Sequence, residues 1–206
     1  MTKAVDDQEA ERHRTKMANR KQRQDEEVAG KTVEEKGLLI VHTGTGKGKS
    51  TAAFGLALRM IGRGKRVGVV QFVKGAWHTA ERDALAKFDD QVAWYSMGEG
   101  FTWETQDLAR DIAAAERAWA KAVELMDDPS FGLVILDELN IALRYDYLPL
   151  ESVIETLKSR RPGLHVVVTG RNAKPELVEA ADLVTDMTLV KHHFAAGVKA
   201  QPGIEF

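Results

Sequence analysis

The chain has 206 residues, of which 44% are hydrophobic and 29% are charged, and its net charge is −2. These values are typical of a globular domain, and the near-neutral charge gives no general attraction to nucleic acid or to anionic membranes. Cysteine is absent, which excludes disulfides, thiolate metal sites and a cysteine nucleophile. No apolar run reaches the length of a membrane span, and the N-terminus lacks the apolar stretch of a signal peptide. We therefore expect a cytoplasmic protein that binds neither nucleic acid nor membrane.

Residues 1–36 differ from the rest of the chain because they contain nine basic and nine acidic residues and very few apolar ones. Such a segment buries too little apolar surface to offset the entropy that is lost on ordering. We expect residues 1–36 to form a flexible or fraying helical segment, with folding over the active site when a ligand or partner binds as the alternative. Residues 37–206 are long enough for one domain with a single core.

The pattern around residues 38–61 is that of a phosphate-binding loop between a strand and a helix. A β-branched run over residues 38–42 precedes the turn GTGKGKS, and an alanine-rich helical pattern covers residues 50–61. In such a P-loop the backbone N–H groups surround phosphate oxygens, the lysine adds positive charge and the hydroxyl binds magnesium. The first glycine stands one position later than in the strict pattern G-x-x-x-x-G-K-[ST], which would place it at Thr43. The predicted nucleotide-binding residues are Gly44, Thr45, Gly46, Lys47, Gly48, Lys49, Ser50 and Thr51.

Strand and helix patterns continue to alternate after this loop, which predicts an α/β fold with a mostly parallel sheet. We expect a three-layer sandwich of the P-loop NTPase (RecA-like) type. The expected strands cover residues 66–73, 91–96, 132–136, 165–169 and 183–189, and the expected helices cover residues 79–88, 105–126, 151–160 and 175–180.

The helices expected over residues 50–61 and 105–126 each carry an apolar stripe that should face the sheet. The stripes consist of Phe54, Leu58 and Ile61 in the first helix, and of Leu108, Ile112, Ala115, Trp119, Ala122 and Met126 in the long one. Gly55 lies inside the first helix, where glycine is unfavourable. We expect it to permit close contact between helix and sheet.

A second feature completes the predicted phosphate site. The apolar strand pattern LVIL ends in Asp137 and Glu138, and a carboxylate at the end of a strand is what a P-loop needs to hold its metal. Because Mg²⁺ prefers oxygen ligands, we predict that Ser50 holds Mg²⁺ (or Mn²⁺) together with Asp137 or Glu138.

Other polar and aromatic residues follow the remaining strands and should open toward the same crevice, because ligands bind outside the carboxyl ends of an open α/β sheet. Arg171 is a candidate for a bidentate phosphate contact. His192 and His193 are expected to be surface or structural residues, because no third ligand stands at metal-site spacing. Phe101 and Trp103 either contact a flat apolar co-substrate or anchor their own loop. The full set is Lys74, Trp77, His78, Phe101, Trp103, Thr169, Arg171, Lys191, His192 and His193.

Several segments together resemble the ATP:corrinoid adenosyltransferases of the P-loop type. They are GTGKGKSTAAFG, VGVVQFVKGAW, GFTWET, LVILDELN, YDYLPLE, VVTGR and VKHHFAAGVKAQPGIEF, and they extend from about residue 37 to the C-terminus. The shifted glycine at position 44 agrees with the pattern G-x-G-K-G-K-[ST] of this family. Ser50 stands where threonine is common, and the hydroxyl is retained.

The resemblance implies transfer of the 5′-deoxyadenosyl group of ATP to Co(I) of a corrinoid, with triphosphate as the leaving group, in cobalamin biosynthesis or salvage. It implies a reversed direction of ATP in the loop, charge stabilisation by Lys49, metal binding by Ser50 and Glu138, and contacts of Phe101 and Trp103 with the corrinoid. It also implies a homodimer, and a reductase or flavodoxin-like protein is a candidate electron donor. The alternatives are a P-loop ATPase or kinase-like enzyme and an ATP-switched corrinoid carrier.

Overall fold

The computed structural model describes residues 6–33, 36–73, 79–88, 90–98 and 107–205. The chain divides into two compact units, Met1–Lys36 and Gly37–Phe206. The first unit contains helix α1, Asp7–Ala29, in which no residue is buried. The Asp6 carboxylate caps the N-terminus of this helix by accepting a hydrogen bond from the N–H of Gln8 at 2.6 Å. Because α1 is polar on every side, it has no apolar face of its own that packing could bury.

The second unit is built on a six-stranded sheet in the order β3-β2-β4-β5-β1-β6, in which every pair of neighbours is parallel. The strands are β1 Leu39–Thr43, β2 Arg66–Gln71, β3 Val92–Ser96, β4 Phe131–Asp137, β5 His165–Thr169 and β6 Leu183–Asp186. Since all strands run the same way, their carboxyl ends meet at one edge of the sheet. The predicted α/β fold of the P-loop type is confirmed.

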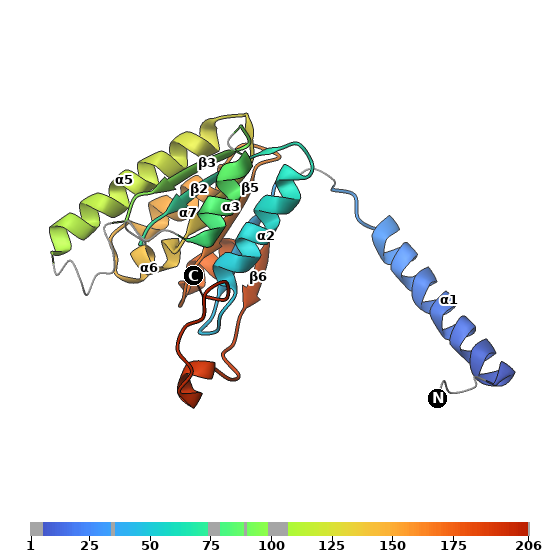
Figure 1. Ribbon diagram of the computed structural model, residues 1–206. Helices are drawn as coiled ribbons and strands as arrows, with labels where there is room; N and C mark the ends of the chain where they lie inside the picture. The colour runs from blue at the N-terminus through green and yellow to red at the C-terminus, as the bar shows by residue number, and fades with distance from the viewer. Residues whose placement is uncertain (1–5, 34–35, 74–78, 89, 99–106, 206) are drawn as a thin grey trace. The chain divides into compact units, whose positions relative to one another are not determined.

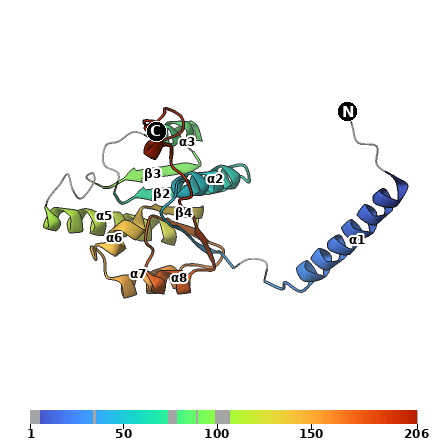
Figure 2. The same cartoon turned by 90° about the horizontal axis from the view of Figure 1, so that it is seen from below.

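Helices cover both faces of this sheet and make the outer two of three layers (Figure 1). One face carries α2, Lys49–Ile61, and α3, Ala80–Leu85, which is followed by the short 3₁₀ helix η1, Ala86–Phe88. The other face carries α5 Leu108–Asp127, α6 Leu139–Arg144, α7 Leu150–Lys158 and α8 Pro175–Ala180 (Figure 2). A second 3₁₀ helix, η2 His193–Ala196, lies in the C-terminal segment. Within the described ranges, no helix combines the length and the apolar character needed to cross a lipid bilayer.

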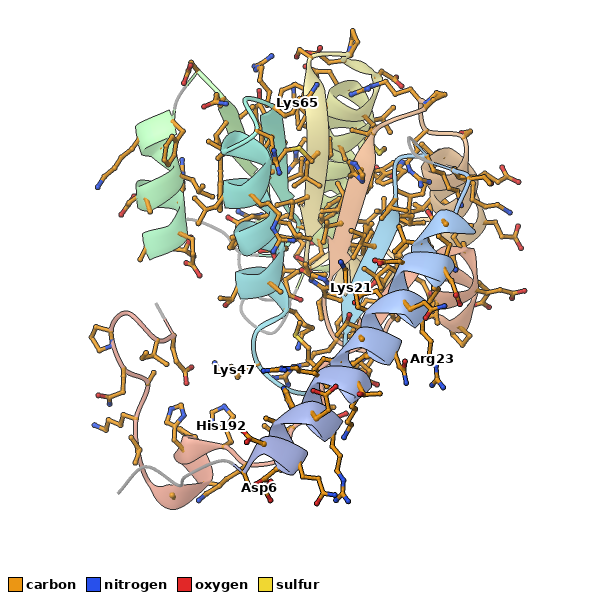
Figure 3. The ribbon with its side chains drawn as sticks, turned by 90° about the vertical axis from the view of Figure 1, so that its right-hand side faces the viewer. Asp6, Lys21, Arg23, Lys47, Lys65 and His192 are labelled. Carbon is orange, nitrogen blue, oxygen red and sulfur yellow. The ribbon has the colours of Figure 1, made fainter. Side chains whose placement is uncertain are left out.

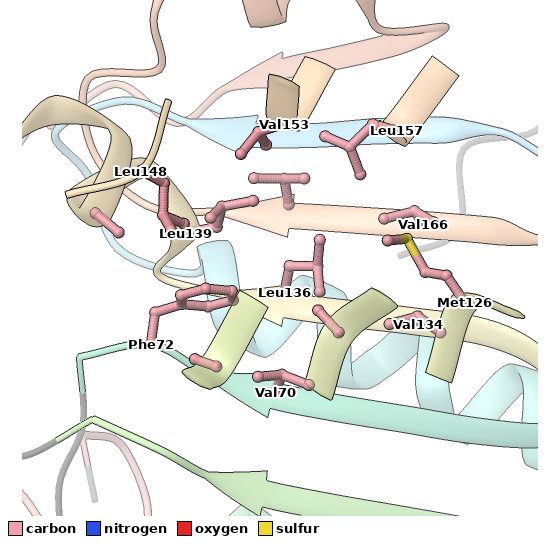
Figure 4. Close-up of a cluster of buried hydrophobic side chains, with 14 of the residues drawn as sticks. Val70, Phe72, Met126, Val134, Leu136, Leu139, Leu148, Val153, Leu157 and Val166 are labelled. Atoms are coloured by element: carbon pink, nitrogen blue, oxygen red, sulfur yellow. The ribbon is translucent and has the colours of Figure 1, made fainter. Parts of the chain in front are cut away.

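The core follows the two-residue period of the strands. In β4, Val134 and Leu136 point into the cluster beneath α5 and α7, while Leu133 and Ile135 point into the cluster beneath α2. Figure 4 shows the first cluster, where Met126 from α5 and Leu157 from α7 pack on the sheet. Burial on both faces explains why the central strands read as continuous apolar runs.

The structure corrects two details of the expected helix faces. Leu58 and Leu108 are 53% and 62% exposed, so they lie outside the stripes that were assigned to them. The buried face of α2 is made by Ala53, Phe54, Ala57 and Ile61 together with Lys49. A Cβ atom on Gly55 would meet nothing within 4 Å, so this glycine is not required for contact with the sheet. Small alanines, rather than long leucines, allow the helix to approach.

Helix α6 is the element that sequence patterns did not predict. It has six residues and follows β4 directly, with Glu138 in the left-handed conformation at φ 63° between them. Six residues make fewer than two helical turns, which is too short a run for an apolar period to reveal the helix. The last strand is shorter than expected, because β6 ends at Asp186 rather than at Leu189.

Candidate functional site

The P-loop and the ends of β4 and β5 surround one cavity of about 730 Å³. The predicted site residues that line it are Gly46, Lys47, Gly48, Lys49, Ser50, Thr51, Glu138 and Arg171. Figure 3 shows Lys47 on the loop before α2, at the end of the unit opposite to Lys65, which precedes β2. The topology therefore brings Arg171, which is distant in sequence, to the phosphate loop at the carboxyl ends of the strands.

Lys49 holds a positive charge beneath the loop. Its side chain is buried, and its Nζ donates hydrogen bonds to the carbonyl oxygens of Gly44, at 2.9 Å, and of Gly46. Burial lowers the pKa of the Lys49 ammonium, and the nearby Glu138 carboxylate opposes this shift. The ammonium is thus oriented by carbonyl oxygens that a phosphate oxygen can replace.

The first two glycines of the loop are explained by packing against the segment that leaves β6. Gly44 has φ 96°, and a Cβ atom there would lie 2.2 Å from Oδ1 of Asp186. The N–H of Gly46 donates to the carbonyl oxygen of Met187 at 2.6 Å, and a Cβ on Gly46 would lie 2.5 Å from the same atom. The side-chain hydroxyl of Thr45 accepts the N–H of Leu189 at 3.4 Å. Gly44 and Thr45 therefore hold the loop against residues 186–189 and are not among the residues that line the cavity.

Asp137 lies beneath the cavity and organises its floor. Its carboxylate is fully buried, and Oδ1 accepts hydrogen bonds from the hydroxyls of Ser50, at 2.7 Å, and of Thr169, at 2.8 Å. Oδ2 accepts a hydrogen bond from Nε2 of Gln71 at 3.0 Å. Because the Ser50 proton points to Asp137, the lone pairs of the Ser50 oxygen are free to face the cavity.

Of the two carboxylates at the end of β4, Glu138 is the one that lines the cavity. Its left-handed backbone turns the chain at the end of β4, and its N–H donates to the Thr169 hydroxyl at 3.0 Å. The hydroxyl of Ser50 and the carboxylate of Glu138 are hard oxygen donors, and both residues line the cavity, which suits Mg²⁺ or Mn²⁺. This donor set fits a divalent cation that is shared with a phosphate chain.

The C-terminal segment, residues 187–205, brings Ile204 and Glu205 to the cavity. The Glu205 carboxylate is hydrogen-bonded to Nζ of Lys47 and lies 2.9 Å from Nε2 of His193. The hydrogen bond with Lys47 lowers the pKa of Glu205, so the carboxylate is ionised at neutral pH. Sequence patterns gave no signal for this contact, which joins residues that are 158 positions apart.

The same segment supplies a third group beside the two neighbouring histidines. Ligand atoms of His192, His193 and Glu205 lie within 4.8 Å of one another. However, Nδ1 of His192 already accepts the N–H of Phe194 at 3.1 Å. This backbone contact supports a structural role for His192.

Another wall of the cavity was missed by sequence reasoning because it belongs to α6. It contains Ile141, Arg144 and Tyr145. The Tyr145 ring is 45% exposed and stacks on Tyr147 with ring centroids 5.7 Å apart. A phosphate loop on one wall and an exposed aromatic ring on another are suited to a ligand that has both a charged and a flat apolar part.

Some predicted residues lie outside the part of the chain that the structure describes. These are Phe101 and Trp103, which were expected to contact a flat co-substrate, and Lys74, Trp77 and His78 after β2. Among the residues that the structure does describe, Thr169 is buried next to Asp137, Arg171 lines the cavity and His193 contacts Glu205.

Comparisons with known proteins agree on one family. The family model described as ATP:corrinoid adenosyltransferase BtuR/CobO/CobP matches residues 35–206. A corrinoid adenosyltransferase of Pseudomonas aeruginosa is 54% identical over 196 residues, covering 95% of this chain and 96% of the relative. One from Sinorhizobium sp. is 56% identical over 197 residues, covering 95% and 92%. One from Escherichia coli K12 is 45% identical over 196 residues, covering 95% and 98%. The match spans the P-loop, the β4 carboxylates and the C-terminal segment, and the chain belongs to the ATP:corrinoid adenosyltransferase family.

Proposed function

We propose that the cavity binds ATP with its triphosphate in the P-loop and that the protein transfers the 5′-deoxyadenosyl group to the cobalt of a corrinoid. The observation that carries this proposal is the convergence of Lys47, Lys49 and Arg171 on one cavity with the Ser50 hydroxyl. Three cationic side chains and the loop N–H groups can stabilise a departing triphosphate, which is the charge that develops in this reaction.

The transfer needs no side-chain nucleophile or base. The Co(I) centre of the reduced corrinoid supplies the electron pair for a new bond to C5′, and the bond between C5′ and its oxygen breaks, so triphosphate leaves with that electron pair and the cobalt becomes Co(III). The protein positions C5′ and stabilises the negative charge that develops on the leaving triphosphate. This role accounts for a site with several cations and with hydroxyl and carboxylate groups that serve as metal or positioning groups.

We propose that Ser50 and Glu138 hold Mg²⁺ (or Mn²⁺), with Asp137 as the residue that orients Ser50. The metal would supply positive charge against the triphosphate oxygens. Asp137 keeps the Ser50 proton directed away from the cavity, and the Thr169 hydroxyl holds both Asp137 and the Glu138 backbone. In this proposal, Asp137 orients Ser50, and Glu138 binds the metal directly.

Further parts of the proposal concern the corrinoid and the partners. Phe101 and Trp103 would form apolar walls against the corrinoid, which would keep water from the reactive Co(I) state. The N-terminal unit would fold over the corrinoid. We also propose a cytoplasmic homodimer that receives electrons from a reductase or flavodoxin-like protein. These statements are supported by the family to which the chain belongs.

The decisive experiment incubates the protein with MgATP and a chemically reduced corrinoid and identifies both products. The proposal expects a light-sensitive alkylcobalt product and an equal amount of triphosphate, formed only when the reduced corrinoid is present. ADP and phosphate released without corrinoid would instead indicate an ATPase in which Glu138 orients water. Tight corrinoid binding without a cobalt–carbon bond would indicate an ATP-switched carrier.

A further inference from the structure

A buried polar network runs across four strands beneath the cavity, and Gln71 is at its centre. The side chain of Gln71, at the end of β2, is 1% exposed. In the parallel register it stands next to Asp137 of β4 on one side and Ser96 of β3 on the other. An amide at this position interrupts a buried apolar strand, so burying it is tolerated only because its hydrogen bonds are satisfied.

The partners of Gln71 determine the direction of its amide. Its Oε1 accepts hydrogen bonds from Nε1 of Trp94 at 3.1 Å and from the hydroxyl of Ser96 at 2.9 Å. The indole N–H is only a donor, so the oxygen of the Gln71 amide is the atom that must face Trp94. The amide nitrogen must therefore face Asp137, as it does at 3.0 Å, and Trp94 prevents the amide from turning over.

From this geometry we infer that Gln71 is a positioning residue for the metal site, acting through Asp137 on Ser50. Gln71 holds Oδ2 of Asp137, so that Oδ1 is directed toward the hydroxyls of Ser50 and Thr169. The Ser50 oxygen then presents its lone pairs to the cavity. Groups that orient metal ligands in this way commonly change metal affinity by about 10- to 100-fold when they are removed. The inference rests on the proposed function, because it assumes a divalent cation at Ser50.

Gln71→Met tests this role, because methionine keeps the length of the side chain and removes the amide donor. We expect the affinity of the protein–ATP complex for Mn²⁺, measured by electron paramagnetic resonance titration, to fall by about tenfold. ATP binding without a divalent cation, measured by calorimetry, should stay within about twofold of the wild type, because the side-chain hydrogen bonds of Gln71 join it to residues of β3 and β4.

Two further variants separate the positioning role of Gln71 from a general effect on the stability of the fold. Val134→Ala removes a buried side chain from β4 on the α5 side of the sheet and should lower the thermal stability without changing Mn²⁺ affinity. Trp94→Phe keeps an aromatic side chain and removes one donor to Gln71, so Mn²⁺ affinity should fall by a smaller factor than in Gln71→Met. In the double variant, Mn²⁺ affinity should be no lower than in Gln71→Met alone, because Trp94 acts on the metal site only through Gln71.

The outcomes distinguish this inference from the proposed function. Wild-type protein that binds ATP equally with and without a divalent cation would overturn the metal site and this inference with it. Wild-type protein with a clear metal dependence, and a Gln71→Met variant with unchanged Mn²⁺ affinity, would overturn the role of Gln71 alone. If Gln71→Met does not fold, Trp94→Phe decides the question, and unchanged Mn²⁺ affinity in that variant would contradict the inference.

Discussion

Replacing Gly44 by alanine tests whether the shifted first glycine of the P-loop is there for packing. The added Cβ would lie 2.2 Å from Oδ1 of Asp186 and 2.7 Å from the backbone N and O of Met187. The backbone also has a positive φ of 96°, which costs an L-residue about 1–2 kcal/mol. Overpacking adds about 1–3 kcal/mol. We therefore expect Gly44→Ala to lose about 2–5 kcal/mol of unfolding free energy.

The matched control is Gly55→Ala in α2. A Cβ atom at Gly55 meets nothing within 4 Å, so alanine should raise stability by about 0.5–1 kcal/mol through its better helix propensity. Thermal unfolding followed by circular dichroism measures both, with about 2–4 °C of Tm for each kcal/mol in a domain of this size. If Gly44→Ala unfolds at the same Tm as the wild type, packing against Asp186 and Met187 does not explain the glycine at position 44.

Three further predictions concern ligand binding. Lys49→Ala should reduce ATP affinity by about 10- to 100-fold, because a charge-assisted phosphate contact is lost. Retained turnover in a folded variant would contradict the role of the lysine. Small residues in place of Phe101 and Trp103 should spare ATP binding but impair use of a Co(II) corrinoid, and equal loss of both would indicate a structural loop. Glu205→Gln should tighten metal-free ATP binding by about two- to fivefold at neutral pH, because the ionised carboxylate that competes for Lys47 is removed. Calorimetry at low and high salt checks this, since the gain should shrink with salt, and weaker binding would show that Glu205 assists the ligand.

The order of elements followed from the sequence because local patterns specify it. The strands β4 and β5 are continuous apolar runs, and the loop between β1 and α2 carries glycines, a lysine and a hydroxyl that suit phosphate. The boundaries of β5 and α8 agree with the expectation. Helix α6 was missed because its six residues are too few to show a helical period.

The sequence by itself determined that a P-loop, a pair of carboxylates at the end of a strand and Arg171 belong to one site, because parallel strands place their carboxyl ends at one edge. Only the tertiary structure decided how the two carboxylates divide their roles. Asp137 is buried under three hydrogen-bond donors, and Glu138 lines the cavity. Asp137 ends β4 between Gln71 and Thr169, which come from neighbouring strands that are distant in the chain, whereas Glu138 lies beyond the strand in the left-handed conformation. The contact of Glu205 with Lys47 and the position of Gln71 beside Asp137 depend on the same long-range pairing.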